Sequence, residues 1–209
     1  AETLGAKICQ ASVNDVDLRD GRVAAIITDQ DRHECDVAIL AAGAWSKRLA
    51  EKLGLSVPLE SERGYHIQFK NTNVVPKAPL MVTTGKFVAT PMTQGLRCAG
   101  VVEFGGLKAP ASTAPLALLR KKAKETFPSL EAGEETTWLG HRPALPDSLP
   151  VIGEIRNTGV FTGFGHHHIG LTAGPKTGRI LAGLITGKRQ NIDLEPYRPG
   201  RFAARGGAH

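Results

Sequence analysis

Apolar and polar residues alternate through residues 6 to 40 in the way that the strands of a small β-meander require. Lys7–Leu18 and Arg22–Asp29 are separated by Asp20-Gly21, a dipeptide typical of a tight hairpin turn. Asp31-Arg32 marks a second turn. The run Val37-Ala38-Ile39-Leu40 is continuously apolar, which predicts a buried strand of a parallel sheet.

Small residues and then a helical segment follow that strand. Ala41–Ser46 allows a ligand or a helix to approach the backbone closely, because small residues leave space at the end of a strand. Ser46 is suited to cap a helix over Lys47–Leu53, which Gly54 ends. Taken alone, Ala41–Ser46 is equally consistent with an ordinary strand-to-helix packing turn.

A different pattern begins at Leu59. Arg63–Phe69 alternates as a half-buried strand. A helix is expected over Ala114–Phe127, because Leu116, Leu119, Ala123 and Phe127 are spaced to share one face. Further strands are expected at Met81–Thr84, Lys86–Pro91, Leu96–Phe104 and Thr136–Leu139. Together these elements predict an antiparallel sheet with one helix.

Residues 142 to 187 form the most distinctive stretch of the chain. An extended segment and a Gly/Pro corner lead to an apolar strand at Val160–Gly163, a glycine-rich loop, and a helix with Pro175 in its first turn. The apolar face of that helix holds Ile180, Leu181, Leu184 and Ile185. Because a helix N-terminus carries unpaired N–H groups and a partial positive charge, we expect an anionic group there, or one that becomes anionic during a reaction.

Two motifs in this stretch carry a family resemblance. One, R-P-x-x-P-D-x-x-P-x-I-G, begins at Arg142, and the other, G-H-x-x-x-G-L-T-x-x-P-x-T-G, begins at Gly165. With Ala41–Ser46, Pro91–Arg97 and Val102–Gly106, the motifs resemble the C-terminal part of the D-amino-acid oxidase superfamily of FAD-dependent oxidoreductases. Within it, the chain is most similar to the small subunits of bacterial D-amino-acid dehydrogenases. The resemblance covers nearly the whole chain.

The resemblance implies an α/β (α+β) fold, in which the remainder of an FAD-binding Rossmann-like domain carries an antiparallel-sheet substrate domain. Residues 1–60 are then part of the FAD-binding domain, and residues 61–141 form the substrate-binding sheet with its helix. Residues 142–190 return to the FAD-binding domain, and residues 191–209 are a tail with a mobile end.

The motif on which this family binds the FAD pyrophosphate, G-x-G-x-x-G on a βαβ unit, is missing from the sequence. We therefore expect the C-terminal half of a flavoenzyme, with the N-terminal half removed by truncation or supplied by a separate chain or second subunit. The isolated chain is expected to have an incomplete FAD site and to be inactive. The alternative is a truncated module with no FAD binding or activity of its own.

By resemblance, FAD is bound non-covalently, because the cysteine that anchors it in some relatives is absent after His141-Arg142. The segment Gly165–Thr172 is expected to cover the flavin ring, with the following helix starting near Ala173 and directed at the edge where reduction places negative charge. A packing role for this glycine loop is the alternative. The residues implied in cofactor binding are Ala42, Gly43, Trp45, Gly165, His166, His167, Gly170, Leu171 and Thr172.

Three side chains are candidates for contact with the substrate. Arg142 offers a planar guanidinium that matches a carboxylate, and it precedes a proline, which favours an extended backbone; its alternative is a structural ion pair with Asp147 or Glu103. Tyr65 is a candidate for closing the pocket or hydrogen-bonding the substrate, with simple packing as the alternative. His168 is a candidate for lining the pocket, with a surface position as the alternative.

Neither a metal nor a nucleic acid is expected as a partner. Consecutive residues of an extended segment point to opposite faces, so His166, His167 and His168 cannot all bind one ion. The net charge of +6 is spread along the chain and aromatic residues make up only 5%, which does not indicate a nucleic-acid groove. The three cysteines show no paired spacing, and no apolar run is long enough to span a bilayer.

The resemblance implies oxidative deamination of a D-amino acid, with Arg142 holding the carboxylate while the α-hydrogen passes as a hydride to the flavin. Oxidation of glycine, sarcosine or hydroxyproline is the alternative within the same fold. Electrons are expected to pass to a quinone or another carrier rather than to O₂. A cytoplasmic location fits the cysteine content, with peripheral contact with the inner membrane left open.

Overall fold

The computed structural model describes residues 2–205, which form two compact units. The first, which we call the split unit, consists of the chain up to Leu59 together with the chain from Pro143 onward. The second, the inserted unit, runs from Glu60 to Arg142. Each unit has a buried core of its own, and each is described by itself.

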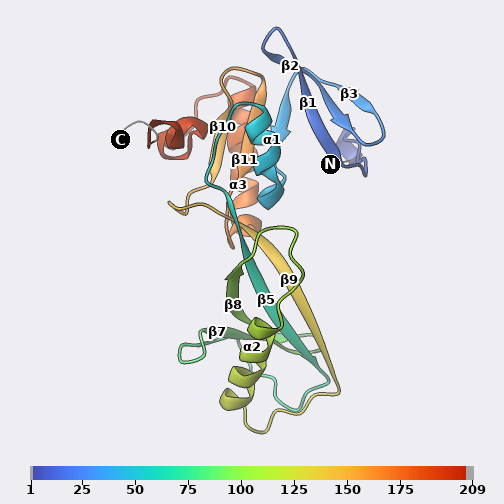
Figure 1. Ribbon diagram of the computed structural model, residues 1–209, viewed down its shortest axis with the longest axis vertical. Coiled ribbons are helices and arrows are strands. Elements are labelled where there is room, and N and C mark those ends of the chain that lie inside the picture. The colour runs from blue at the N-terminus through green and yellow to red at the C-terminus, as the bar shows by residue number, and fades with distance from the viewer. Residues whose placement is uncertain (1, 206–209) are drawn as a thin grey trace. The chain divides into compact units, whose positions relative to one another are not determined.

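The split unit begins with a three-stranded antiparallel meander (Figure 1). β1 (Val13–Arg19) and β2 (Arg22–Thr28) are joined by Asp20 and Gly21, whose φ angles of 51° and 78° are those of a type I′ turn. β3 (Arg32–Glu34) pairs with β2. The predicted hairpin is confirmed, although β1 begins at Val13 rather than at Lys7.

A second sheet of the split unit has the strand order β10–β11–β4. β11 (Val160–Phe164) is parallel to β4 (Ala38–Leu40) and antiparallel to β10 (Val151–Glu154). The predicted apolar strands are thus present. β4 has the sequence of an interior strand, yet it lies at the edge of this sheet, and its Ile39 is 50% exposed.

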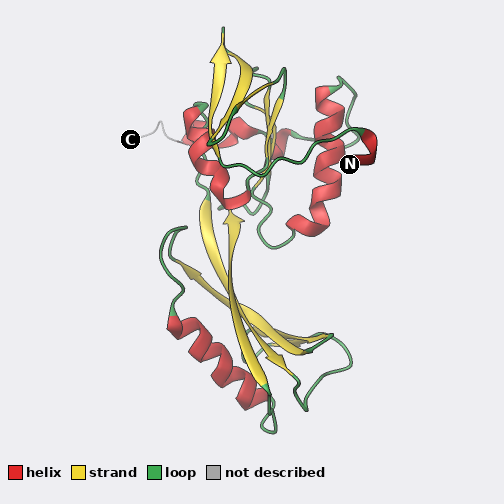
Figure 2. Cartoon of the chain, turned by 90° about the vertical axis from the view of Figure 1, so that its right-hand side faces the viewer, coloured by secondary structure: helices red, strands yellow, loops and turns green. Residues whose placement is uncertain are grey.

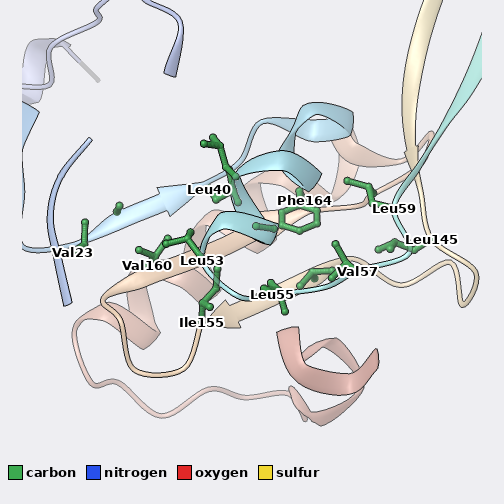
Figure 3. Close-up of a cluster of buried hydrophobic side chains, with 14 residues drawn as sticks. Val23, Leu40, Leu53, Leu55, Val57, Leu59, Leu145, Ile155, Val160 and Phe164 are labelled. Atoms are coloured by element: carbon green, nitrogen blue, oxygen red, sulfur yellow. The ribbon is translucent and has the colours of Figure 1, made fainter. Parts of the chain in front are cut away.

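Two helices pack against opposite faces of this sheet. On one face, Val160 and Phe164 of β11 join the main core with Leu49 and Ala50 of α1 (Ser46–Lys52). Figure 3 shows Val160 and Phe164 in this cluster. On the other face, Phe161 packs with Ile180 and Leu181 of α3 (Gly170–Ile185). This alternation along β11 buries both of its faces, and it confirms the apolar face predicted for the C-terminal helix.

The starts of both helices differ from the prediction. Ser46 does not cap α1, because the helix already includes Ser46, and the buried Ser46 hydroxyl has no hydrogen-bond partner within the described chain. Pro175 lies inside α3 instead of in its first turn, because the helix begins at Gly170 rather than near Ala173. Since proline has no N–H, the carbonyl of Leu171 lacks the donor that a regular helix would supply.

The chain after α3 packs back onto the split unit. It contains two short 3-10 helices, Glu195–Tyr197 and Pro199–Arg205. Arg201 donates from Nε to Asp147 at 2.8 Å and lies over the ring of Phe202, which contacts the main core. The end of the tail, at residues 206–209, lies outside the described residues, so the expectation that it is mobile is not addressed.

The inserted unit is a five-stranded sheet with one helix, as predicted (Figure 2). Its strand order is β6–β7–β8–β5–β9, and α2 (Thr113–Thr126) packs on one face. The strands are β5 (Glu60–Lys70), β6 (Leu80–Val82), β7 (Phe87–Met92), β8 (Gly95–Phe104) and β9 (Glu134–Ala144). All four predicted residues of the helix face contact this core, with Leu119 and Ala123 fully buried. Of the helices described, none has both the length and the apolar character needed to cross a bilayer.

A buried polar network ties β5 and β8 to the start of α2. The Arg63 side chain is 1% exposed and donates to the Pro110 carbonyl at 2.5 Å and to the Tyr65 hydroxyl at 3.1 Å. Tyr65 donates to Glu103 at 2.6 Å, and the Ser112 hydroxyl donates to the other carboxylate oxygen at 2.5 Å. The bonds from Ser112 and Tyr65 lower the pKa of Glu103. The network therefore favours an ionised Glu103 and fixes the segment that leads from β8 into α2.

We expect Glu103→Gln to loosen that segment, because the neutral amide accepts weakly from Ser112 and Tyr65 and leaves Arg63 without its counter-ion. Backbone amide exchange at Ser112 should accelerate by about fivefold or more, with exchange in the split unit unchanged. A lowered carboxyl pKa contributes stability above its ordinary value of 4.5, which is lost as pH falls. The variant should therefore lose less stability on acidification than the wild type. Identical exchange and identical acid sensitivity in both proteins would contradict this role.

Candidate functional site

A hollow of about 740 Å³ lies beside α3 in the split unit, and we call it the α3 hollow. Five of the predicted cofactor-binding residues line it: Gly43, Gly165, His166, His167 and Gly170. Four do not, namely Ala42, Trp45, Leu171 and Thr172, although each lies within two residues of one that does. The structure thus brings together two segments that are far apart in the sequence, the end of β4 and the start of α3.

The chain turns sharply between β11 and α3 to form one wall of the α3 hollow. Gly165 has a φ angle of 87°, and a Cβ there would lie 2.4 Å from Leu145 Cδ1. His167 also has a positive φ, of 51°. Its N–H donates to the Pro143 carbonyl at 3.2 Å, and its Nε2 accepts from the Leu145 N–H at 2.9 Å. Accepting at Nε2 places the proton of a neutral His167 on Nδ1. These contacts fix the corner to residues 143–145.

His166 is buried and is held by α3. Its Nε2 lies 2.9 Å from Thr177 Oγ1, and the residue is 8% exposed. Burial lowers the pKa of His166, so the imidazole is neutral around pH 7. At His166, the buried lining of the α3 hollow is therefore polar but uncharged.

The start of α3 is uncapped, and its first residue, Gly170, lines the hollow. Ile169 precedes the helix and provides no side-chain cap, so the first-turn amides have neither an intrahelical nor a capping acceptor. At Gly174 and Gly178, an added Cβ would meet no atom within 4 Å. Leu171 is 96% exposed. A partial positive charge and bare helix backbone thus border the same space.

Thr177, Gly174 and Gly178 line the hollow but were not among the sequence candidates. The spacing of four residues between Gly170, Gly174 and Gly178 was the available signal, because residues four apart share one face of a helix. That signal was missed because α3 was expected to begin near Ala173, which left Gly170 outside the helix.

The three consecutive histidines differ from one another in environment. His167 and His168 lie in a turn and not in an extended segment, so alternation along an extended chain does not explain why the three cannot share a metal. His166 contacts Thr177 and His167 contacts Leu145, whereas His168 is exposed. Among the residues that the structure describes, no three His, Cys, Asp or Glu side chains form a group suited to a metal ion. A pocket role for His168 stays a prediction.

Arg142 lies on β9 in the inserted unit, and residues of β5 hold its side chain in place. Its Nη1 donates to Glu62 Oε1 at 3.1 Å, and its guanidinium lies directly over Gly64, where an added Cβ would come within 2.4 Å of Cζ. The ion pairs expected as alternatives, with Asp147 or Glu103, are wrong, because Asp147 pairs with Arg201 and Glu103 with Arg63. The side chain is 27% exposed, and within the described chain its other N–H groups make no hydrogen bond. They are available for a further anion.

Tyr65 lies on the opposite face of β5 from Arg142. It is 1% exposed, and its hydroxyl donates its only proton to Glu103 while accepting from Arg63 and the Ser112 amide. These contacts favour the packing role for Tyr65. Direct contact with a substrate stays a prediction for this residue.

A second hollow, of about 540 Å³, lies between the meander and the end of β4. Apolar side chains from β1, β2, β4 and α1 line it, including Val16, Ile26, Leu40 and Leu53. Residues Ile39 and Ala41 border both hollows. The edge strand β4 therefore has apolar space on each side of its exposed residues.

Comparison with known proteins identifies relatives along most of the chain. A family model described as FAD dependent oxidoreductase matches residues 1–184. A D-amino-acid oxidase of Bradyrhizobium diazoefficiens is 39% identical over 95% of this chain and 48% of its own length. A D-amino acid dehydrogenase of the same organism is 30% identical over 99% of this chain and 50% of its own. A glycine oxidase of Pseudomonas aeruginosa is 32% identical over 87% and 50%. The chain spans about half the length of these relatives.

Solved structures share the fold. The crystal structure of an iminodiacetate oxidase from Chelativorans sp. BNC1 matches with a TM-score of 0.82 and 24% identity, over 95% of this chain and 55% of that one. At this identity the match supports the fold alone. The mixed α/β architecture with antiparallel sheets is therefore that of FAD-dependent oxidases, and the fold class expected from the sequence is confirmed.

The lowered pKa of His166 predicts a pH-dependent stability. Folding keeps this imidazole neutral, so its contribution is complete above the ordinary value of 6.5 and is lost as pH falls toward the lower folded pKa. Thermal unfolding measured between about pH 7.5 and about pH 5 should show a larger loss of stability in the wild type than in His166→Gln. His168→Gln, at an exposed position, is the matched control and should follow the wild type. Parallel loss in all three proteins would show that His166 does not contribute.

Proposed function

Because this chain belongs to the FAD dependent oxidoreductase family, whose model matches residues 1–184, we propose that it is the C-terminal part of an enzyme that oxidatively deaminates D-amino acids. The observation that carries this proposal is the α3 hollow, where an uncapped helix start and bare glycine backbone border one space. D-amino acids are favoured as substrates because the relative with 39% identity is named D-amino-acid oxidase.

The α3 hollow supports FAD as the cofactor. Its volume of about 740 Å³ lies within the range of about 300–1,000 Å³ found for ligand and cofactor pockets. Gly174 and Gly178 let a large flat group approach the helix backbone, because no side chain stands in the way. We assign the lining residues Gly43, Gly165, His166, His167 and Gly170 to FAD contact. Ala42, Trp45, Leu171 and Thr172 are further candidates next to them.

Arg142 is the proposed ligand of the substrate carboxylate. Glu62 holds one side of the guanidinium and Gly64 lies beneath it, so the position of the remaining N–H groups is fixed before any ligand binds. A charged hydrogen bond of this kind contributes about 1.5–3 kcal/mol. Binding of the carboxylate therefore positions the α-carbon, and strict positioning provides much of the rate enhancement in such a reaction.

FAD, when bound, supplies the two-electron acceptor that converts the amino acid into an imine, which water then hydrolyses. The chain's own contribution is electrostatic. The first-turn amides of α3 direct partial positive charge toward the hollow, which stabilises a group that becomes anionic there. The neutral state of His166 keeps that region free of a competing full charge. The electron acceptor is proposed to be a quinone or another carrier, reached by peripheral contact with a membrane or in solution.

A second polypeptide segment is the proposed partner that completes the FAD site. β4 has an unpaired edge, an interior-type apolar sequence, and a hollow on each side of Ile39 and Ala41. An exposed edge of this kind pairs with an added strand. The chain also spans only about half the length of its curated relatives. The proposed segment is either an N-terminal half of the same protein or a separate subunit.

Glycine oxidation is the second candidate function. It is favoured by the 32% identity to a glycine oxidase over 87% of the chain. The two candidates share the cofactor and the carboxylate contact, and they differ only in what surrounds the substrate side chain.

The role of Arg142 can be tested without removing its charge. Gly64→Ala places a methyl group within 2.4 Å of the guanidinium, and because this is the flexible end of a side chain, the guanidinium moves while the fold is retained. In the flavin-loaded protein, which is this chain in complex with the second segment that completes the FAD site, the KM for amino-acid substrate should rise by about tenfold or more. Arg142→Lys should lower kcat/KM by about 10- to 100-fold. Gly133→Ala, where a Cβ meets only ordinary contacts, is the matched control. An unchanged KM in Gly64→Ala would exclude Arg142 as the carboxylate ligand.

The need for a second segment predicts a result for the 209-residue chain alone. Purified by itself it should show no flavin absorbance, and co-expression with the N-terminal half of the Bradyrhizobium diazoefficiens D-amino-acid oxidase should yield a yellow complex. One bound flavin per isolated chain would contradict the requirement for a partner. A colourless co-purified complex would contradict the FAD site itself.

A further inference from the structure

Figure 2 shows α2 lying against one face of the inserted-unit sheet. The other face presents exposed side chains that do not belong to the buried core of this unit. The covered face holds the odd-numbered residues of β5, such as Ile67 and Phe69. The even-numbered residues, Glu62, Gly64 and His66, therefore point to the uncovered side. We call this uncovered side the open face.

Three large apolar side chains are exposed on the open face. Val102 pairs with Gly64 and Phe104 pairs with Glu62 in the β5–β8 register, so both share the face of those residues. Trp138 of β9 stacks on His66, with ring centroids 5.1 Å apart and an interplanar angle of 19°. Phe104 is 71% exposed, Trp138 57% and Val102 46%. Exposed apolar side chains grouped in this way are typical of a binding surface rather than of an ordinary solvated sheet.

Two of these apolar side chains, Val102 and Phe104, lie across from the residues that hold the guanidinium of Arg142. The guanidinium lies over Gly64, and Val102 is the residue directly across from Gly64 on the neighbouring strand. Neighbouring strands are about 5 Å apart, so Val102 begins about one strand spacing from the guanidinium, and Phe104 lies beside it, opposite Glu62. An anion on Arg142 would thus have its attached group next to Val102 and Phe104.

Charged groups near this surface already have partners. Glu62 accepts from Arg142, and Arg97 donates to Gln68 at 3.1 Å. His66 has a lowered pKa, because it is partly buried and lies near Arg97, so the imidazole under Trp138 is uncharged around pH 7. A charged group placed against Val102 and Phe104 would lose hydration without gaining a partner. An apolar group has no charge to desolvate, so its binding would not carry this cost.

We propose that Val102, Phe104 and Trp138 bind the side chain of the amino acid whose carboxylate Arg142 holds, and that they select bulky apolar side chains, branched or aromatic, over glycine and over charged side chains. This specificity rests on the proposed amino-acid oxidation and makes that activity more precise. It also separates the two candidate functions, because glycine has no side chain to fill this surface.

Turnover by the flavin-loaded protein tests the specificity. D-phenylalanine and D-leucine should have kcat/KM values at least about tenfold above those of D-alanine and glycine. Each added apolar carbon strengthens transition-state binding by a small factor, and an aromatic ring or a branched group adds several such carbons. Phe104→Ala and Val102→Ala should each reduce the ratio of kcat/KM for D-phenylalanine to kcat/KM for D-alanine by about tenfold. Leu118→Ala is the matched control, because Leu118 is 47% exposed on α2, on the other side of the sheet.

A binding measurement on the chain itself gives a second readout. The sequence contains two tryptophans, so Trp45→Phe leaves Trp138 as the single tryptophan whose fluorescence is measured. Phenylacetate should change Trp138 fluorescence at concentrations at least about tenfold lower than acetate, and Arg142→Gln and Phe104→Ala should both abolish this difference.

The outcomes separate this inference from the activity on which it rests. If the panel is oxidised but the D-phenylalanine to D-alanine ratio is near one, or unaffected by Phe104→Ala, the specificity is wrong and the activity stands. If no amino acid is oxidised, both are overturned. If the chain self-associates in solution and Phe104→Ala makes it monomeric, the open face is an interface between copies and the specificity is again wrong.

Discussion

The corner between β11 and α3 requires glycine at position 165, because the backbone there has a positive φ and an added Cβ would lie 2.4 Å from Leu145 Cδ1. Gly165 adopts a positive φ, and the next turn is held by the bonds from His167 to Pro143 and Leu145. Because the chain turns there, α3 begins at Gly170 and its first-turn amides remain uncapped beside the hollow. The same contacts fix the segment that directly follows Arg142 in the sequence. The proposed cofactor site thus depends on one backbone corner.

The split unit and the inserted unit contribute different physical properties to the proposed reaction. The split unit provides partial positive charge and bare helix backbone, which suit a large flat group that gains electrons. The inserted unit provides a full positive charge, held in place by Glu62 above Gly64, and exposed apolar side chains on the same face of its sheet. Both properties come from strands or long helices rather than from free loops, so they are already ordered before any ligand binds.

The sequence predicted the elements better than their ends. Hydrophobic periodicity located the hairpin, the apolar strands, and the buried faces of α2 and α3, because these depend on local patterns. It failed at both helix starts. Ser46 and Pro175 have strong positional preferences, yet tertiary packing placed the buried Ser46 inside α1 and carried α3 back to Gly170. Tertiary packing overrides local helix propensity where it favours another helix boundary.

Site residues were predictable only as far as a motif marked them. The corner, the arginine, Thr177 and Gly178 belong to recognisable sequence patterns, whereas Gly64 acts through a contact with Arg142 on another strand. The partner of Arg142 could not be read from the sequence for the same reason, since Glu62 lies on another strand. Pairing register, which sets such contacts, is not a local property.

The most direct test of the central claim is amide hydrogen exchange at Gly170, Leu171 and Thr172 in the flavin-loaded protein and in the same protein stripped of FAD. If FAD occupies the α3 hollow, these amides should be slow to exchange with FAD and fast without it, while the amides of β7 in the inserted unit remain unchanged. Equal exchange at the start of α3 in both forms would contradict the claim that this helix faces the cofactor.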